Sequence, residues 1–309
     1  MKGLELSKAY YEEFGKPMLE QQFPELLKYI AVGFVGSGSD RYGFDDEISR
    51  DHDFEPGFCI FLPGEDVVDR RSAFLLERAY AKLPKEYMGF KRQPLSPVGG
   101  NRNGVMRTTE FYGKAVGAPD GRLSPDAWLR IPDYALAESV NGEVFYDGYG
   151  EFSAIREGLL HMPKDIMLKR LAGNLLIMAQ AGQYNFRRCI SHGEAEAAQL
   201  ACHEFVCSAM KVIFLLRGKY LPYYKWSFRA LRQLDTEQKY SEKLASLLGS
   251  GSAVEKHKAI EEISAEIICE LKNLNITKAT CGDLERHAYS VNDSISDGQL
   301  RNMHVLTAI

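Results

Sequence analysis

The sequence lacks several patterns by which common functional sites are recognised. None of its six cysteines forms a C-x-x-C pair, so a zinc ribbon is unsupported. No Lys-Ser or Lys-Thr follows the glycine turn at Gly36, which excludes a P-loop ATPase. In a calcium loop begun at Asp51, Pro56 would occupy the glycine position and Leu62 the position of the bidentate glutamate. Zinc-ribbon, P-loop and calcium-loop chemistry are therefore not expected.

The chain also lacks excess positive charge and long apolar segments. Its net charge of −4 is not that of a general nucleic-acid binder, although local basic patches remain open. Residues 1–14 lack the apolar core of a signal peptide, and we expect no apolar run long enough to span a bilayer. The scattered cysteines indicate reduced thiols. We therefore expect a cytoplasmic protein that does not act on membranes.

Composition and pattern predict two domains. A length of 309 residues is long for one hydrophobic core, and 45% hydrophobic with 26% charged residues is typical of globular proteins. Short apolar runs alternate with helical patterns up to about residue 150, and only helical patterns follow. We predict an α+β protein, with a small mixed sheet and flanking helices in residues 1–155 and a helical bundle in residues 156–309.

The expected elements follow from apolar periodicity and from Gly and Pro boundaries. Strands are predicted at residues 30–35, 58–62, 105–116 and 143–146. Helices are predicted at residues 65–83, from Ser124 onward, and at 165–186, 194–217, 236–248 and 254–274.

The most informative segment joins the first two predicted strands. Gly-Ser-Gly-Ser at positions 36–39 follows the first apolar run, and Asp51 and Asp53 precede the second. If these acids open a strand, their i, i+2 spacing places both side chains on one face. A glycine-serine turn can hold a phosphate through backbone amides, and paired carboxylates can hold Mg²⁺. The segment indicates a nucleoside-triphosphate enzyme, and the alternative is a capped turn with two surface aspartates.

The same residues carry a resemblance to a known superfamily. The glycine-serine turn, the Asp-x-Asp and the change from α/β to helical patterns resemble the polymerase beta-type nucleotidyltransferases. The sequence at 43–53, Gly-Phe-Asp-Asp-Glu-Ile-Ser-Arg-Asp-His-Asp, resembles an uncharacterised bacterial family within it, as do the sequences at 142–147 and 220–226. The resemblance covers the chain from about the first strand to Leu231. It implies a nucleotidyltransferase-like fold and nucleotidyl transfer to a hydroxyl.

The resemblance also suggests roles for individual residues. Asp51 and Asp53 would be catalytic metal ligands, and two Mg²⁺ ions can bind both the attacking and the leaving oxygens of such a transfer. Gly36, Ser37 and Ser39 would bind the triphosphate, with ATP the foremost donor. A glycine permits close approach to the phosphates. His52 lies between the two acids and is expected to pack on the opposite face.

A third carboxylate usually completes this site. Glu110 on the predicted strand 105–116 is the candidate, although an exposed strand glutamate fits its pattern nearly as well. Glu143 is the alternative. Asp147 is expected instead to cap the helix that begins near Glu151.

The loop before Asp51 is longer than in the common superfamily pattern and is rich in acids. We expect solvated loop charges, while an ordering role through Arg41 or Arg50 is the alternative. The acids concerned are Asp40, Asp45, Asp46 and Glu47.

The helical half offers candidates for closing the site. Lys225 would contact triphosphate oxygens as a point charge. Its neighbours Tyr223, Tyr224 and Trp226 either stack on a base or pack into the core. Weaker candidates, for which ordinary helix positions are the commoner explanation, are Arg187, Arg188 and Glu204.

These expectations combine into one favoured function and one rival. The favoured function is Mg²⁺-dependent transfer of a nucleoside monophosphate to a small hydroxylated molecule, such as an antibiotic-like acceptor, with nucleic acid disfavoured as a partner. The rival is a catalytically degenerate fold that binds a nucleotide or a protein partner, as in a toxin–antitoxin pair. The third carboxylate distinguishes them.

Overall fold

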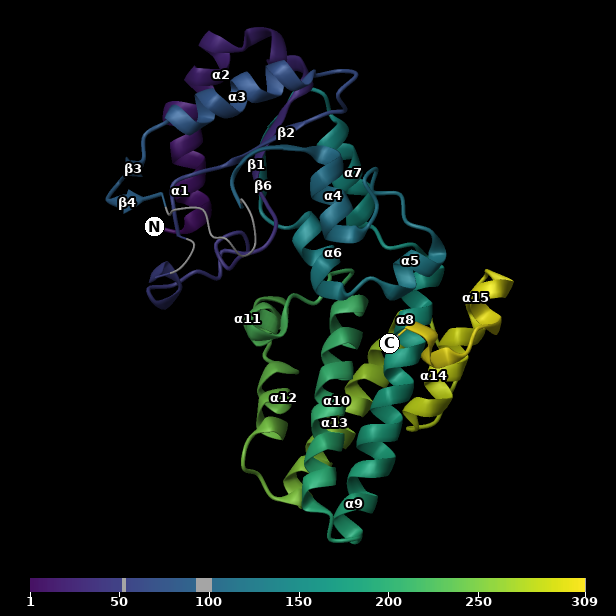
Figure 1. The fold of residues 1–309 in the computed structure, drawn as a ribbon. Coiled ribbons are helices and arrows are strands. Elements are labelled where there is room, and N and C mark those ends of the chain that lie inside the picture. Colours follow the sequence, from purple (N-terminus) through teal and green to yellow (C-terminus); the bar gives the residue numbers. More distant parts are fainter. Residues whose placement is uncertain (52–53, 93–101, 309) are drawn as a thin grey trace. The chain divides into compact units, whose positions relative to one another are not determined.

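The computed structural model describes residues 1–51, 54–92 and 102–308, and the chain forms two compact units (Figure 1). The α/β unit consists of Met1–Leu123 and Tyr134–His161, and the helical unit consists of Ser124–Asp133 and Met162–Ile309. The boundary predicted after residue 155 falls inside helix α7 (Glu151–Leu160). The segment Ser124–Asp133, placed in the first domain from sequence, lies in the helical unit.

The α/β unit is built on a mixed four-stranded sheet of order β5-β2-β1-β6. β1 (Ala31–Phe34) pairs antiparallel with β2 (Cys59–Leu62) and β6 (Glu143–Asp147), whereas β5 (Gly104–Arg107) runs parallel to β2. β1 and β2 are fully buried apolar runs, ended by Gly36 and Pro63 as the sequence predicted. The α+β class and the small mixed sheet are confirmed.

The other elements of this unit, in chain order, are α1 (Gly3–Tyr10), η1 (Tyr11–Gly15), α2 (Lys16–Gln22), η2 (Pro24–Tyr29), η3 (Ile48–Asp51), α3 (Arg70–Lys82), β3 (Glu86–Tyr87), β4 (Phe90–Lys91), α4 (Thr108–Val116), α5 (Pro125–Arg130, of the helical unit), α6 (Asp133–Val140) and α7.

Helices cover both faces of the sheet. Because side chains alternate along a strand, Ile60 and Leu62 of β2 enter a core shared with Tyr10 of α1. Phe61 points the other way and stacks on Phe152 of α7, with ring centroids 4.1 Å apart. The sheet is thus a buried platform, and its functional groups lie in the loops that leave the strands.

The strand predicted at residues 105–116 is wrong beyond Arg107. A helix, α4, starts at Thr108 because Glu110 accepts a hydrogen bond from the backbone N–H of Arg107 at 3.4 Å, as a residue in the third helical position does. Gly117 ends the helix in the left-handed conformation, with φ of 73°. The β-branched and aromatic residues of this segment favoured a strand, but the two ends specify a helix.

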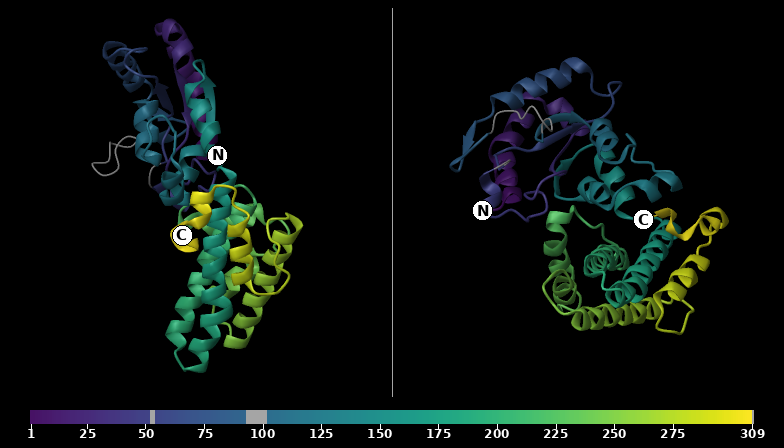
Figure 2. Two further views of the ribbon diagram at one scale, coloured as in Figure 1. Left: turned by 90° about the vertical axis from the view of Figure 1, so that its right-hand side faces the viewer. Right: turned by 60° about the horizontal axis from the view of Figure 1, so that its bottom comes forward.

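The helical unit is a bundle whose central helix is α10 (Ala195–Leu216) (Figure 2). Its elements, besides α5, are α8 (Lys164–Met178), η4 (Ala179–Phe186), α9 (Arg187–Ser191), α10, α11 (Tyr224–Leu234), α12 (Ser241–Leu248), α13 (Ala253–Asn273), α14 (Leu284–Asp293), α15 (Gly298–Asn302) and η5 (Val305–Ala308).

Within the described residues, α10 alone is long and apolar enough to cross a membrane by length and composition. The expectation that no run reaches this length is therefore not met. However, 56% of its most apolar window is buried inside the protein, as in the central helix of a bundle.

Two polar clusters hold the bundle together. Arg170 of α8 pairs with Asp133 at 3.1 Å and donates to the Trp128 carbonyl at 3.4 Å, which fastens Ser124–Asp133 to α8. Burial raises the pKa of Asp133, and Arg170 opposes that shift. The second cluster surrounds Glu270 of α13. Burial alone would raise the pKa of Glu270, but hydrogen bonds from Arg217, Tyr240 and Lys239 outweigh burial and lower the pKa to about 2.

Candidate functional site

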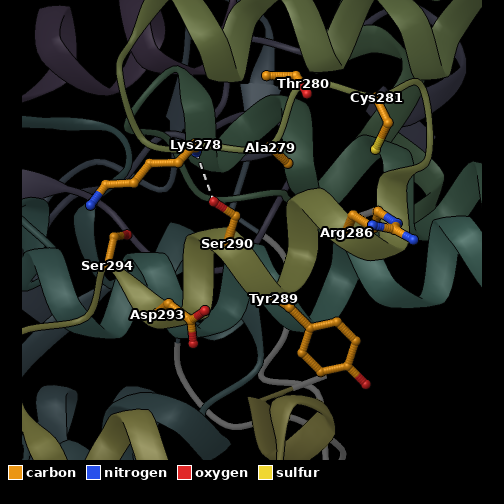
Figure 3. A pocket seen from close by; sticks show the side chains of 9 residues that line it. All are labelled: Lys278, Ala279, Thr280, Cys281, Arg286, Tyr289, Ser290, Asp293 and Ser294. Carbon is orange, nitrogen blue, oxygen red and sulfur yellow. Dashed lines mark hydrogen bonds between the residues drawn. The ribbon is translucent and has the colours of Figure 1, made fainter.

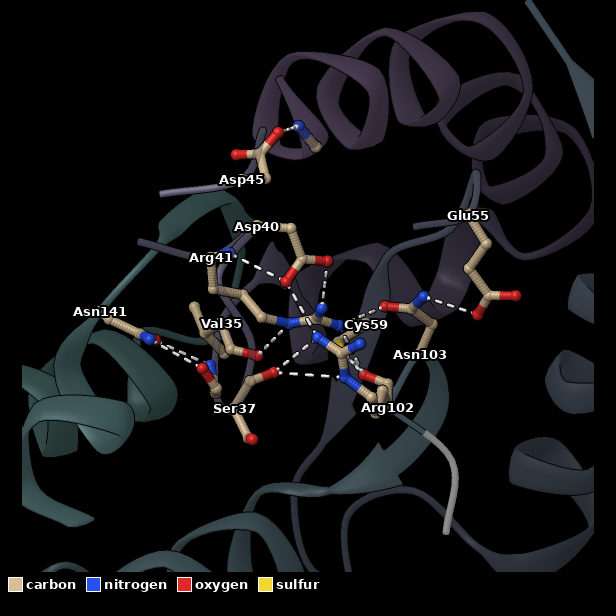
Figure 4. A network of polar contacts seen from close by, with 12 residues as sticks. Val35, Ser37, Asp40, Arg41, Asp45, Glu55, Cys59, Arg102, Asn103 and Asn141 are labelled. Carbon is tan, nitrogen blue, oxygen red and sulfur yellow. Dashed lines mark hydrogen bonds and ion pairs between the residues drawn. The ribbon is translucent and has the colours of Figure 1, made fainter. Parts of the chain in front are cut away.

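The loop that follows β1 is a tight glycine turn. Gly36 has φ of 100° and Gly38 has φ of 130°, values that residues with a Cβ rarely adopt. Asn141 brackets Gly36, because its side-chain oxygen accepts from the Gly36 N–H at 2.8 Å and its amide donates to the Gly36 carbonyl at 2.7 Å (Figure 4). Asn141 thereby ties the turn to the short segment between α6 and β6.

The turn leaves consecutive backbone donors open. In the part of the chain that the structure describes, no acceptor binds the N–H groups of Ser37, Gly38 or Ser39. Successive N–H groups in such a turn form a concave surface that suits an anion. The Gly36 N–H, which the sequence placed in the same role, is occupied by Asn141.

A buried ion cluster packs against the glycine turn and supports it. Asp40 accepts from Arg41 Nη1 at 2.6 Å and from Arg102 Nη2 at 2.9 Å, and the Arg102 Nη2 also donates to the Ser37 carbonyl at 2.8 Å. The Asp40 and Arg41 side chains are only 7% and 1% exposed. A Cβ on Gly38 would lie 1.8 Å from Arg102 Nη2, so the close approach of this guanidinium requires glycine.

Arg41 links the cluster to three strands. Its Nε donates to the carbonyl of Val35 at 3.3 Å, and its guanidinium carbon lies 4.0 Å from the centre of the Phe34 ring. Its Nη2 donates to Asn103 Oδ1 at 2.8 Å, and Asn103 in turn donates to Glu55 at 3.1 Å (Figure 4). The chain segments before β2 and β5 are thus held at the glycine turn.

Burial corrects the expectation of solvated loop charges at two of the four acids. Asp40 is 5% exposed and Asp45 is 1% exposed, whereas Asp46 and Glu47 are exposed as expected. Asp45 accepts from the Gly3 N–H at 3.0 Å, at the N-terminus of α1, where backbone donors and the helix dipole favour a carboxylate. The alternative, in which Asp40 orders the loop through Arg41, describes the structure.

The expected metal ligands are only partly described. Asp51 ends the short helix η3, and its side chain, with His52 and Asp53, lies outside the described residues. The expectation that Asp51 opens a strand is wrong, because β2 begins at Cys59. Pro56, which has no N–H to donate, and Gly57 lie just before it. The argument from alternating strand side chains therefore does not apply to Asp51.

The two candidates for a third carboxylate, and the predicted cap Asp147, each bind other groups of the protein. Glu110 lies in the first turn of α4, not on a strand, and its carboxylate accepts a hydrogen bond from the Arg107 N–H. Glu143 does lie on a strand, β6, and forms an ion pair with Lys8. Asp147 accepts from the N–H groups of Gly150 and Ser153 at 2.7 and 2.8 Å, so its predicted capping role is confirmed.

Two further features of the structure bear on ligand binding. Among the described residues, no group of three or more His, Cys, Asp or Glu side chains is placed to hold a metal ion. A hollow of about 600 Å³ lies in the helical unit beside α14, lined in part by Lys278, Arg286 and Asp293 (Figure 3). None of the residues singled out from the sequence lines this hollow.

The predicted residues of the helical unit are mostly exposed. Lys225 lies in the first turn of α11 with its ammonium 4.6 Å from the centre of the Trp226 ring. Tyr223 and Tyr224 are 40% and 76% exposed, which excludes packing of Tyr224 into the core. The remaining candidates, Arg187 and Arg188 of α9 and Glu204 of α10, are exposed helix residues.

Sequence inspection missed Arg102, Asn103 and Asn141, which hold the glycine turn. Arg102 and Asn103 stand at the end of a Pro- and Gly-rich sequence, and Asn141 belongs to an Asn-Gly pair, patterns that by themselves indicate only a loop and a tight turn. Polar residues immediately before β5 and near the start of β6 were the available signal.

Comparisons with known proteins give limited information. Residues 128–227 match the model of a domain of unknown function, DUF4037. No curated protein matches the chain. Among solved structures, the chain is similar to a nucleotidyltransferase-like protein from Exiguobacterium sibiricum 255-15, with 10% sequence identity and a TM-score of 0.38, over 83% of this chain and 76% of that chain.

Proposed function

We propose that this protein is a nucleotidyltransferase that moves a nucleoside monophosphate from a nucleoside triphosphate, foremost ATP, to a hydroxyl of a small molecule. The observation that carries the proposal is the glycine turn after β1, with its open N–H groups at Ser37, Gly38 and Ser39. The turn leads along the chain to Asp51 and Asp53, the acid pair that resembles the metal ligands of this superfamily.

The described residues form the proposed phosphate site, whereas the side chains of the proposed metal ligands lie outside the described part of the chain. Three consecutive N–H groups on a turn fixed by Asn141 and Arg102 match the oxygens of a phosphate chain. Two carboxylates are the donor type that Mg²⁺ prefers. Asp51 and Asp53 would hold it, and when bound the metal neutralises charge on the transferred phosphoryl group.

The other residues of the site act by positioning. Asp40, Arg41 and Arg102 keep the turn in one conformation, so the backbone donors need no rearrangement when a triphosphate arrives. In-line positioning of this kind supplies much of the catalysis in phosphoryl transfer.

The test is calorimetric titration of ATP, GTP, CTP and UTP in the presence of Mg²⁺. We expect one triphosphate to bind, and Asp53→Ala to abolish the Mg²⁺-dependent part of the binding. Glu47→Gln, which removes an exposed acid of the same loop, should bind like the wild type. Release of pyrophosphate with hydroxylated acceptors would then identify the reaction. Unchanged binding in Asp53→Ala would refute the assignment of the site.

A second function has a specific observation in its favour. On the four strands of the sheet, the carboxylates are Glu143 and Asp147, and both are engaged by other protein groups. A site with only two acids would bind a nucleotide or a protein partner without turnover. Triphosphate binding without pyrophosphate release for any acceptor, or co-purification of a stoichiometric protein, would favour this alternative.

A further inference from the structure

Charge is strongly segregated in one part of the helical unit. Every charged residue between Glu204 and Asp235 is a lysine or an arginine, although the whole chain has a net charge of −4. Arg217 of this stretch is neutralised by its ion pair with Glu270 at 2.6 Å. Of the other five basic residues, Lys211 belongs to α10, whereas four lie on α11 or at the exposed Lys219 before it. An overall acidic composition therefore conceals a local basic surface.

The basic residues of α11 form a stripe. Lys225, Arg229 and Arg232 are spaced i, i+4 and i+7, which places them on one face of the helix, and all three are exposed. At a rise of 1.5 Å per residue, the stripe is roughly 10 Å long. Ala230 and Leu231 on the inner side are buried and fix the helix in the bundle. A charge stripe of this length can follow more than one phosphate of a strand.

Exposed aromatic rings stand at the beginning of the stripe. Tyr224 is 76% exposed and its ring centroid lies 4.5 Å from that of Tyr223, which is itself 40% exposed. The Trp226 ring lies 6.4 Å from Tyr223 and faces the Lys225 ammonium at 4.6 Å. Large exposed rings that lie together commonly mark a binding surface. Here they are combined with cations rather than with further apolar residues.

We propose that the α11 surface, formed by Tyr223, Tyr224, Lys225, Trp226, Arg229 and Arg232, binds single-stranded nucleic acid. Unpaired bases stack on exposed aromatic rings while basic side chains follow the phosphate backbone. An acidic peptide would satisfy the cations but not the rings. A single nucleotide would satisfy one ring and leave most of the stripe unused.

This surface belongs to the helical unit alone. The proposal therefore holds whether or not the α/β unit transfers nucleotides, and Asp53→Ala should leave strand binding unchanged. That variant separates a failure of this proposal from a failure of the proposed function.

The test is fluorescence anisotropy of a labelled twelve-nucleotide oligo(U), titrated with the full-length protein at several salt concentrations. We expect Tyr224→Ala to weaken binding about tenfold, the scale of one lost base stack. The double variant Lys225→Gln, Arg232→Gln should lower the slope of log Kd against log salt by about 1.4. Each lost phosphate contact contributes about 0.7 to this slope for a single strand.

Matched controls lie elsewhere on the protein. Tyr289→Ala removes a 46% exposed tyrosine of α14, and Arg122→Gln removes a 91% exposed arginine, and both should bind like the wild type. Tyr224→Ala should keep the melting temperature, since so exposed a ring contributes little to folding. A duplex of the same length should bind less tightly, because its bases are already stacked.

Three results would overturn the proposal. One is absence of oligo(U) binding at low salt. A second is equal loss of affinity in the control variants, or equally tight binding of dextran sulfate that Tyr224→Ala does not change, which would indicate charge alone. The third is competition by UMP at the same concentration as oligo(U), which would indicate a mononucleotide site.

Discussion

The ion cluster under the glycine turn gives the sharpest prediction for the α/β unit. Asp40→Asn keeps the shape of the side chain but removes its charge, while Arg41, 1% exposed, remains buried and charged. Removing one partner of a buried ion pair costs about 3–5 kcal/mol, because the other charge is left uncompensated. The amide oxygen of asparagine can still accept one hydrogen bond, so we expect a loss of about 3 kcal/mol in the free energy of unfolding.

The assay must report on the α/β unit alone. Both tryptophans, Trp128 and Trp226, lie in the helical unit, so their fluorescence serves only to check that this unit stays folded. Hydrogen exchange of the β1 amides measures opening of the α/β unit directly. A loss of about 3 kcal/mol should lower their protection roughly 100-fold, at 1.4 kcal/mol per factor of ten.

The control and the refuting result use the same loop. Glu47→Gln removes an exposed acid and should change the free energy of unfolding by less than about 0.5 kcal/mol. If Asp40→Asn costs less than about 1 kcal/mol, the cluster does not hold the turn electrostatically, and the positioning role given to Arg41 and Arg102 is wrong.

Three further predictions concern other parts of the chain. Gly38→Ala should destabilise the α/β unit by at least about 2 kcal/mol more than Gly43→Ala, as measured by hydrogen exchange. Both glycines have positive φ, but only at position 38 would the added Cβ clash with Arg102. Glu270, whose pKa is lowered from 4.5 to about 2 in the folded state, should stabilise the helical unit above about pH 4.5 by roughly 2–3 kcal/mol. This contribution should be lost as the pH falls toward 2. Tryptophan-detected unfolding should show no such pH dependence in Glu270→Gln and should retain it in Glu242→Gln, which changes an exposed residue. Glu110→Gln should leave triphosphate affinity unchanged in calorimetry, since Glu110 caps α4.

The sequence predicted those elements whose information is local. β1 and β2 were found because short apolar runs end at Gly36 and Pro63, and the capping role of Asp147 followed from its place just before α7. In residues 108–116, β-branched and aromatic content favours a strand, but the helix signals prevail, which are Glu110 in the third position and Gly117 at the end.

The supports of the candidate site could not be predicted in this way. Buried Asp40 accepts a hydrogen bond from Arg102, 62 residues further along the chain, and buried Asp45 accepts one from the backbone of Gly3, 42 residues before it. An acid in a polar loop looks solvated until its distant partner is known. Pairing across such separations depends on the order of strands in the sheet, which periodicity does not specify.

The segment Ser124–Asp133 has a consequence for how the protein can be made and divided. It reaches the helical unit before the α/β unit is complete in sequence, so the chain passes between the two units three times. During synthesis, Trp128 and Asp133 emerge ahead of Arg170, the residue that later fastens them. A fragment that stops at residue 155 would carry this segment without its partner, and one that starts at residue 156 would leave Arg170 buried without its acid. No single cut yields two complete domains, so neither unit can be inherited, expressed or exchanged as one continuous piece of the gene.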